Sequence, residues 1–247
     1  MCCFSGPVRD VANTKIFARA TAHERQLLAY QMTFSTATDL AMILPLPVPE
    51  GTADGALRFI DLEGYPEFFD QLKSGFPEPP SRSVSNGPLG RTAAAAPLPV
   101  EQVGSFEASF VPSAQDFARL DPRFRMPDGV WRRLPQYRSF GFAVFKLKKD
   151  AHTVHPMAFE FPRVPGGKLF FPTVHIHDGT VHATAWFDHS LYCQAKGHPA
   201  ALEGWRESPQ PAGLFADVKR AQGLLDKDGH CYFKRLTGTL ENRDTLI

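Results

Sequence analysis

The chain has 247 residues with a formal net charge of +1 at pH 7, and 21% of its residues are charged. This length is sufficient to bury a substantial hydrophobic core, and the nearly neutral charge argues against a nucleic-acid partner. No segment approaches the roughly 20 apolar residues that cross a bilayer, and the N-terminus lacks the charged and apolar regions of a secretory signal. We therefore expect a cytoplasmic protein that does not associate with a membrane.

Proline and phenylalanine are abundant, with 22 and 21 residues respectively. Proline interrupts long helices and central strands, so this composition favours short strands and turns. We expect a single α+β domain over residues 1–247, built on a mainly antiparallel β-sheet meander with two to three short helices. The cysteines at positions 2, 3, 193 and 231 form neither a CxxC zinc pattern nor a dense disulfide framework, which indicates reduced thiols.

The chain begins with MCCFSGP, so removal of Met1 would make Cys2 the N-terminal residue. A thiol beside its own α-amino group, whose pKa is about 7.7 to 8.0, gains a built-in base. This start resembles that of N-terminal cysteine amidohydrolases of the choloylglycine-hydrolase and penicillin-acylase class, in which an early arginine lies near the nucleophile. Cys2 would then be catalytic and Arg19 is the candidate match, but the later aspartate and asparagines of that class have no convincing counterparts. The alternatives are apolar packing of Cys2 and Cys3 or a share in a metal site.

Residues 39–49 are DLAMILPLPVP, which predicts a buried strand and an extended proline-spaced tail. Together with MCCFS and the strand-like segments 14–19 and 26–34, this segment is similar to bacterial proteins classed as a domain of unknown function. The later segments HPMAFEFP and FFPTVHIHDG look like the full-length members of that family. The resemblance implies a bacterial protein in which both ends of the chain belong to one fold, and it brings no established activity.

The middle of the chain alternates between short elements and irregular segments. Residues 65–75 are predicted to form a short helix, with proline near its start and glycine as its stop. The Pro/Ser/Ala-rich segment 76–99 has almost no apolar periodicity, so we expect a long loop or linker, either mobile or acting as a lid. Strand character returns at 100–111, and residues 113–120 are predicted to be a second short helix.

Residues 121–138 are irregular and rich in arginine around Trp131. The arginines of this cluster are Arg123, Arg125, Arg132, Arg133 and Arg138. Guanidinium groups bind carboxylates and phosphates through paired hydrogen bonds, so the cluster is a candidate site for a small-molecule ligand with such a group. The alternative, which suits a nearly neutral protein, is a solvated surface.

Strands are predicted at 139–149 and 155–161, and a turn then leads towards the histidine-rich segment. Towards the C-terminus, residues 213–226 show the apolar spacing of an amphipathic helix. A final strand is predicted at 231–236.

Seven of the nine histidines lie between residues 152 and 198. Asp178-Gly179 lies between two segments rich in β-branched and aromatic residues and is typical of a two-residue hairpin turn. This turn would pair His175 with His182. Because side chains alternate along a strand, His175, His177 and His182 would then share one face of the hairpin.

Three imidazoles on one face can bind a divalent metal and leave a fourth position for water or substrate. Zinc, iron and copper all suit imidazole ligands. His155 heads a preceding strand and is a further candidate ligand. Asp188 shares the parity of His182 and is the candidate carboxylate that orients an imidazole during catalysis. The alternative is an ordinary solvated face that carries His and Thr.

His189 and Cys193 have the opposite parity, so we expect them on the other face as a core histidine and a buried thiol. A second centre formed by these two residues and the N-terminal cysteines is the alternative. The leading hypothesis is a metal-dependent enzyme or a metal-binding protein. An N-terminal cysteine amidohydrolase is one alternative, and a non-enzymatic binding or assembly protein is another.

Overall fold

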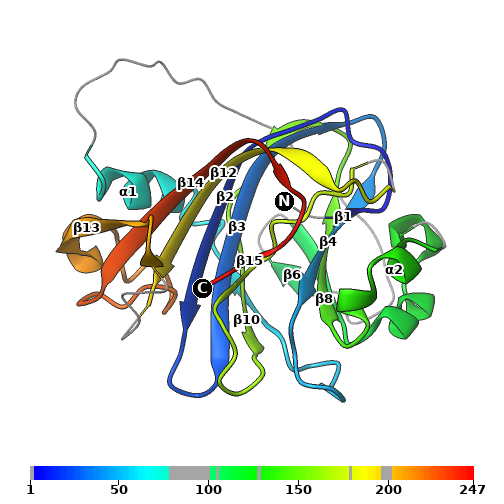
Figure 1. The fold of residues 1–247 in the computed structure, drawn as a ribbon, viewed down its shortest axis with the longest axis horizontal. Helices are drawn as coiled ribbons and strands as arrows, with labels where there is room; N and C mark the ends of the chain where they lie inside the picture. Colours follow the sequence, from blue (N-terminus) through cyan, green and yellow to red (C-terminus); the bar gives the residue numbers. More distant parts are fainter. Residues whose placement is uncertain (1–2, 78–100, 104–105, 127–128, 178–179, 196–201) are drawn as a thin grey trace.

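The computed structural model describes residues 3–77, 101–103, 106–126, 129–177, 180–195 and 202–247. Strands dominate these residues and most neighbouring strands are antiparallel, which confirms the α+β class in outline. Figure 1 shows long central strands with short helices to either side of them.

The described strands form two large sheets and one small one. The five-stranded sheet has the order β1 (Cys3–Phe4), β4 (Leu40–Leu46), β8 (Gly141–Leu147), β7 (Phe106–Val111) and β6 (Glu101–Val103). The eight-stranded sheet has the order β13 (Arg206–Pro211), β14 (His230–Glu241), β12 (Thr184–Gln194), β2 (Asp10–Ala20), β3 (Arg25–Thr36), β10 (Met157–Pro162) and β5 (Arg58–Asp61), and β9 (Asp150–Thr153) also pairs with β3. The small sheet joins β11 (Phe170–Phe171) to β15 (Thr245–Leu246).

The helical elements are short. They are α1 (Phe68–Ser74), α2 (Val130–Arg133) and the 3-10 helices η1 (Ala114–Arg119), η2 (Pro122–Phe124), η3 (Pro135–Tyr137) and η5 (Ala212–Leu214). None of the described helices is long and apolar enough to cross a membrane.

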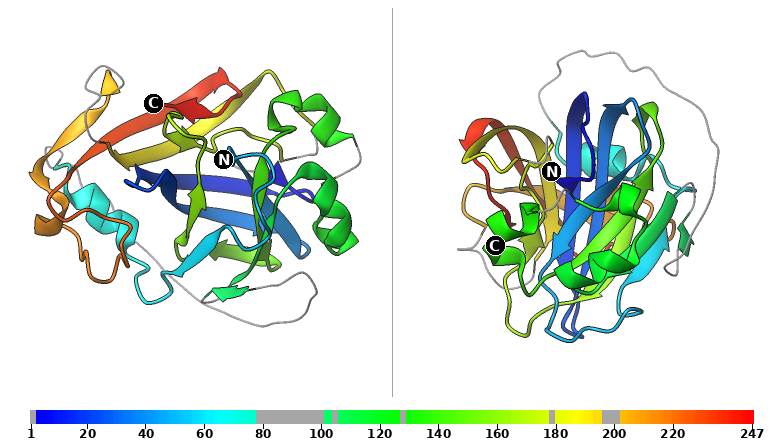
Figure 2. Two further views of the ribbon diagram at one scale, coloured as in Figure 1. Left: turned by 90° about the horizontal axis from the view of Figure 1, so that it is seen from below. Right: turned by 90° about the vertical axis from the view of Figure 1, so that its right-hand side faces the viewer.

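The main core lies between the two large sheets, which face each other (Figure 2). The ring of Phe145 on β8 lies 5.9 Å from that of Phe159 on β10 and 5.7 Å from that of Phe59 on β5. Alternation along β2 explains this burial, because Ile16 joins the core between the sheets while Phe17 joins a second cluster on the opposite face. The central strands are therefore apolar on both faces.

Short helices cover the outer faces of both sheets (Figure 1). On the eight-stranded sheet, Phe68 of α1 makes an edge contact with Phe17, with ring centroids 5.8 Å apart. On the five-stranded sheet, Phe142 contacts Phe117 of η1 at 5.0 Å and Trp131 of α2 at 4.5 Å. The molecule thus has two sheets in the middle and a thin helical layer on each side.

The strand order is not that of the expected meander. Strand β2 is antiparallel to β3 on one side and parallel to β12 on the other. Strand β8 belongs to the five-stranded sheet, whereas β10 lies between β3 and β5 in the eight-stranded sheet. The prediction was wrong here because apolar alternation identifies a strand without identifying its partner.

The helix predictions have mixed outcomes. The helix at 65–75 is present as α1, and residues 113–120 form η1 instead of an α-helix. Residues 213–226 complete η5 and then form turns, and not an amphipathic helix. Gln222 and Gly223 have φ values of 48° and 86°, in the left-handed region that interrupts a helix. Most of the predicted loop at 76–99 lies outside the described residues.

Candidate functional site

The histidine-rich segment does not form the predicted hairpin. The described residues from 172 to 183 lie outside the strands, and the predicted turn, Asp178-Gly179, is not among the described residues. The side chain of Asn242 connects the segment around His175 to the segment around His182. Its Oδ1 accepts a hydrogen bond from the amide of His175 at 2.7 Å, and its Nδ2 donates to the carbonyls of His175 and His182 at 2.9 and 3.0 Å. The direct pairing of His175 with His182 was therefore wrong.

A cluster of imidazoles nevertheless exists, with a different membership. The ring of His175 lies 5.2 Å from that of His177 and 5.1 Å from that of His189, measured between centroids. Phe187 contacts both His175 and His189, at 4.4 and 5.0 Å. His189 comes from β12, whose inward side also carries Phe187 and Leu191. Parity placed His189 away from His175, and that inference failed because residues 172–175 do not continue a regular strand.

The other predicted site residues lie elsewhere. His182 is exposed. His155 packs against Phe106, with ring centroids 4.4 Å apart. Asp188 forms an ion pair with Arg235, with an N–O distance of 2.8 Å, and accepts a long hydrogen bond of 3.4 Å from the amide of Asn13. Asp188 is half-buried and lies on the face of β12 opposite to Phe187 and His189. Its ion pair with Arg235 connects β12 to β14, in place of the predicted role of orienting an imidazole.

Burial keeps the imidazoles of His175 and His189 electrically neutral. His175 is 6% exposed and His189 is fully buried. Desolvation lowers the pKa of His175 to about 2, and the neighbouring His177 adds to this shift. Burial likewise lowers the pKa of His189 far below its ordinary range. A buried cation without a compensating charge is unfavourable, so both rings stay neutral near pH 7.

Neutral imidazoles are competent metal ligands, but their orientation matters as well. Within the part of the chain that the structure describes, no three His, Cys, Asp or Glu side chains are arranged to hold a metal ion as they stand. The Nε2 atom of His175 is buried and has no hydrogen-bond partner among the described residues. Such an atom carries a desolvation cost, so the cluster would gain from a partner at this position.

The cysteine hypothesis finds no assembled site among the described residues. Cys2 lies outside them, and Cys3 is buried where its backbone bridges to Ile176. Arg19 donates hydrogen bonds to the carbonyls of Leu224 and Gly223 at 2.7 and 2.5 Å, which anchors the turns after η5. Burial also raises the pKa values of the Cys193 and Cys231 thiols, so these are unreactive core groups.

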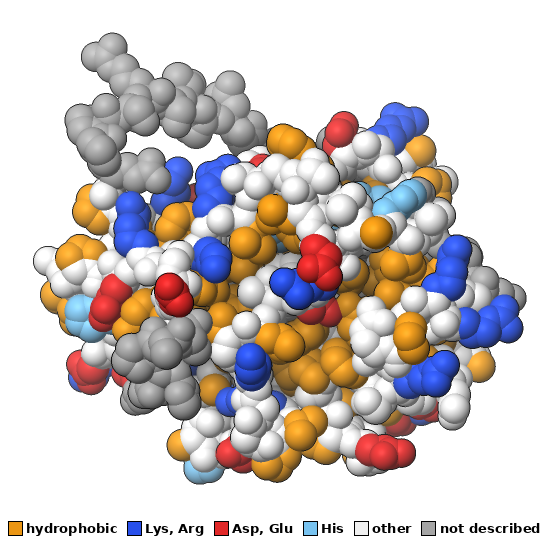
Figure 3. Space-filling view, viewed as in Figure 1, with side chains coloured by type: hydrophobic (Ala, Val, Ile, Leu, Met, Phe, Trp, Pro, Cys, Tyr) orange, Lys and Arg blue, Asp and Glu red, His pale blue; other side chains and the backbone are white. Residues whose placement is uncertain are grey.

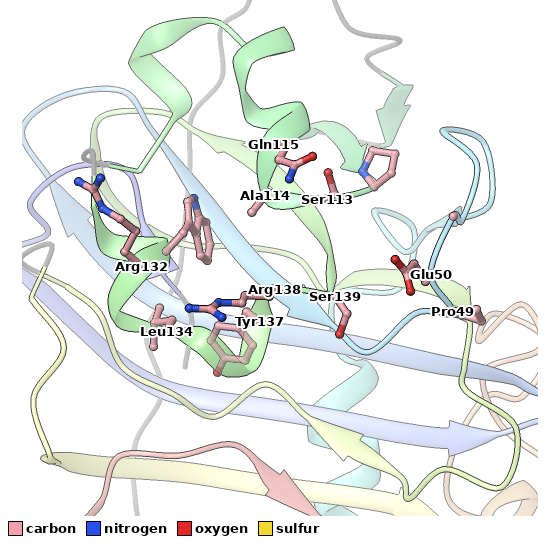
Figure 4. Close-up of a pocket in the computed structure, with 13 residues that line it drawn as sticks. Pro49, Glu50, Ser113, Ala114, Gln115, Arg132, Leu134, Tyr137, Arg138 and Ser139 are labelled. Atoms are coloured by element: carbon pink, nitrogen blue, oxygen red, sulfur yellow. The ribbon is translucent and has the colours of Figure 1, made fainter.

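A cavity of about 600 Å³ lies on the outer side of the five-stranded sheet. Its walls come from the loop after β4, from the start of η1 and from α2 and η3 (Figure 4). The lining residues are Pro49, Glu50, Gly51, Pro112, Ser113, Ala114, Gln115, Trp131, Arg132, Leu134, Tyr137, Arg138 and Ser139. This volume lies within the range of about 300 to 1,000 Å³ that is usual for small-molecule sites.

Two of the five clustered arginines, Arg132 and Arg138, line this cavity. Both are exposed, and neither forms an ion pair with another described residue. Arg125 instead donates to the carbonyls of Leu120 and Ala118, at 2.8 Å from Nε and Nη2 respectively, and so supports the end of η1. Several Lys and Arg side chains gather at the edge of the molecule near α2 (Figure 3). The cavity therefore has a cationic side.

The floor of the cavity is tied to the C-terminal segment. Tyr137 is 2% exposed and its hydroxyl donates a hydrogen bond to the carboxylate of Asp244. Asp244 Oδ1 also accepts hydrogen bonds from the amides of Thr173 and Val174, at 2.8 and 3.1 Å. Burial raises the pKa of Asp244, although these hydrogen bonds oppose the shift. Tyr137 is thus a fixed wall of the cavity.

The arginine-rich segment was a sequence signal for one wall of this cavity. No sequence signal indicated the opposite wall. Pro49, Glu50 and Gly51 follow β4, and their sequence indicates a turn. Nothing in that pattern indicates that Glu50 lies across a cavity from residues 132–138. This proximity arises because β4 and β8 are neighbours in the five-stranded sheet.

Comparisons with known proteins add similarities but no activity. No family model matches the chain, and no curated protein matches it. This is consistent with an uncharacterised family. Among solved structures, baculovirus P35 is similar at 13% identity with a TM-score of 0.49, over 99% of this chain and 98% of that one. A mutated baculovirus P35 after caspase cleavage has 13% identity and a TM-score of 0.48, over 95% and 98%. P35 in a caspase-8 complex has 12% identity and a TM-score of 0.46, over 95% of each chain.

Proposed function

We propose that this protein binds a small anionic ligand in the cavity between η1 and the α2–η3 segment. The observation that carries the proposal is a cavity of about 600 Å³ that Arg138 and Arg132 line without a carboxylate partner among the described residues. A guanidinium group that faces a cavity can form charge-assisted hydrogen bonds with a carboxylate or a phosphate. The ligand would supply the missing negative charge.

The rest of the lining supports a ligand with an apolar body. Leu134 and Tyr137 are buried, and Trp131 stacks on Phe117 with ring centroids 5.1 Å apart. This stack holds the indole in place before a ligand arrives, so little side-chain entropy is lost on binding. Apolar walls with a few fixed polar groups are the usual construction of a small-molecule site.

A test of this function uses 4-ethylbenzoate as the probe, with binding measured by calorimetry. The wild-type protein is expected to bind one equivalent, and Arg138→Gln is expected to weaken binding about tenfold through loss of a charge-assisted hydrogen bond. Phenyl phosphate, titrated in parallel, shows whether carboxylate or phosphate is preferred. High salt should weaken both.

The matched control is Arg133→Gln, which removes the same charge from α2 at a residue that does not line the cavity. This variant is expected to bind like the wild type. Equal losses in Arg138→Gln and Arg133→Gln would mean that only the general positive potential matters. Equal binding of the neutral analogue 4-ethylbenzyl alcohol would contradict the proposal.

A second candidate function is transition-metal binding by His175, His177 and His189. It is favoured by the buried Nε2 atom of His175, which has no hydrogen-bond partner among the described residues. Zinc, iron and copper all suit neutral imidazoles. The rings would have to turn about their side-chain bonds to bring three nitrogens within about 2.0 to 2.1 Å of one ion.

Elemental analysis of protein dialysed against zinc, and then against buffer, tests this candidate. About one equivalent is expected in the wild type, and His175→Ala and His189→Ala are each expected to lose it. His182→Ala is the matched control and should retain the metal, because His182 is exposed and outside the cluster. Metal-free wild-type protein, or loss of metal in His182→Ala, would exclude this set of ligands.

A further inference from the structure

We propose that the ligand of the cavity is dipolar, with an anionic group at Arg138 and a cationic group at Glu50, separated by an apolar spacer. This inference rests on the proposed function and specifies its ligand class. Glu50 is the single acidic residue among those that line the cavity. Figure 4 shows it on the wall formed by the loop after β4, across from Arg138 and Tyr137.

The position of Glu50 is fixed by a tight turn. The amide and the hydroxyl of Thr52 both donate to the carbonyl of Pro49, at 3.3 and 2.6 Å. Gly51 has a φ of 76°, which favours glycine at this position of the turn. The backbone on both sides of Glu50 is therefore held in place, which keeps this residue on the cavity wall.

The charges of the cavity do not neutralise each other. Among the described residues, Glu50 forms no ion pair with Arg132 or Arg138, although all three line the same cavity. The nearby carboxylates already have partners. Asp54 pairs with Arg119 at 2.5 Å, and Asp116 accepts a hydrogen bond from Ser113 at 2.7 Å.

The rest of the cavity lining is largely apolar. Pro112, Trp131 and Leu134 belong to it, and Ser139 and Gln115 add neutral polar groups. An ammonium group beside Glu50 and a carboxylate beside Arg138 would each meet an opposite charge, while the spacer covers the apolar wall. An amino-carboxylate with its charges at opposite ends fits this arrangement better than a simple anion.

The test compares two probes that differ at one position. In 4-(aminomethyl)benzoate an ammonium group replaces the terminal methyl group of 4-ethylbenzoate, at the end of the ring opposite the carboxylate. The wild-type protein is expected to bind the amino compound about three-fold to five-fold more tightly, the size of a partly exposed ion pair. Glu50→Gln is expected to abolish this preference, so that the variant binds the two probes with equal affinity.

The control variant is Glu63→Gln, which removes an exposed acid that does not line the cavity and should preserve the preference. Equal affinity of the wild type for both probes would overturn the dipolar ligand, as would a preference that survives Glu50→Gln. The anion-binding function is judged separately by the effect of Arg138→Gln on 4-ethylbenzoate. Failure of the two proposals can therefore be distinguished.

Discussion

Acidification from about pH 7.5 to about pH 5 is expected to destabilise the folded protein by about 4 kcal/mol through two buried histidines. In the unfolded chain His175 and His189 have pKa values near 6.5 and take up protons over this range. In the folded protein burial lowers both pKa values, that of His175 to about 2, so these rings remain neutral. The contribution of these two histidines to the free energy of unfolding is complete above their pKa in the unfolded chain. It is lost as the pH falls below that value. Each accounts for about 2 kcal/mol at pH 5.

Urea unfolding at several pH values, in the presence of a chelator, measures this effect. The variant His189→Leu should remove about half of the pH dependence, whatever its stability near pH 7.5. The exposed residue His182 provides the control, because His182→Leu should unfold with the wild-type pH dependence. Asp244 has the opposite effect on the pH dependence of stability, because burial raises its pKa. It is present in all three proteins, so it does not affect the comparison between them. An unchanged slope in His189→Leu would contradict the prediction.

The second large effect is expected from Asp244→Ala, which should lower the free energy of unfolding by about 3 kcal/mol. The substitution removes the acceptor for the amides of Thr173 and Val174 and for the hydroxyl of Tyr137. These donors are buried, and water cannot replace the carboxylate at full strength. Thermal or urea unfolding of the purified variant measures the loss.

Asp244→Asn is the matched control. Its amide oxygen can still accept from the two backbone amides, and its amide nitrogen can donate to the Tyr137 oxygen, so the expected loss is below about 1 kcal/mol. Tyr137→Phe should also be mild, because it removes one donor and leaves the backbone contacts intact. If Asp244→Ala and Asp244→Asn lose equal stability, the hydrogen bonds to the carboxyl group are not the cause.

Local patterns predicted local structure well. The strand-like segments 14–19 and 26–34 correspond to β2 and β3. The proline and glycine of 65–75 correctly predicted α1, in which Phe68, Phe69 and Leu72 are buried. The segment 213–226 has a similarly periodic pattern, yet it forms turns. Ala221, Leu224 and Leu225 are buried there without a helix, whereas Leu214 is exposed. The Arg19 side chain donates hydrogen bonds to the carbonyls of Leu224 and Gly223.

For the candidate sites as well, the sequence pattern reflected local segments but not the long-range contacts between them. The density of histidines predicted a triad of His175, His177 and His182, whereas the rings in contact with His175 are those of His177 and His189. Asn242, 60 positions beyond His182, bonds to the backbone of both His175 and His182 in place of the predicted strand pairing. The arginine-rich segment indicated an anion site, whereas Glu50 entered the cavity only through the pairing of β4 with β8. Contacts of this kind depend on the assembled sheets and leave no periodic signal in the sequence.

The position of β2 has a consequence for the order of folding. This strand is among the first segments of the chain to be synthesised. Its parallel neighbour β12 pairs with it only across long sequence separations, such as the 175 residues between Asn13 and Asp188. Until β12 has been synthesised, one edge of β2 has no partner and exposes unpaired backbone amides and carbonyls. Such non-local closure slows folding and leaves a nascent chain prone to aggregation. A chain truncated before β12 is therefore a poor candidate for independent folding.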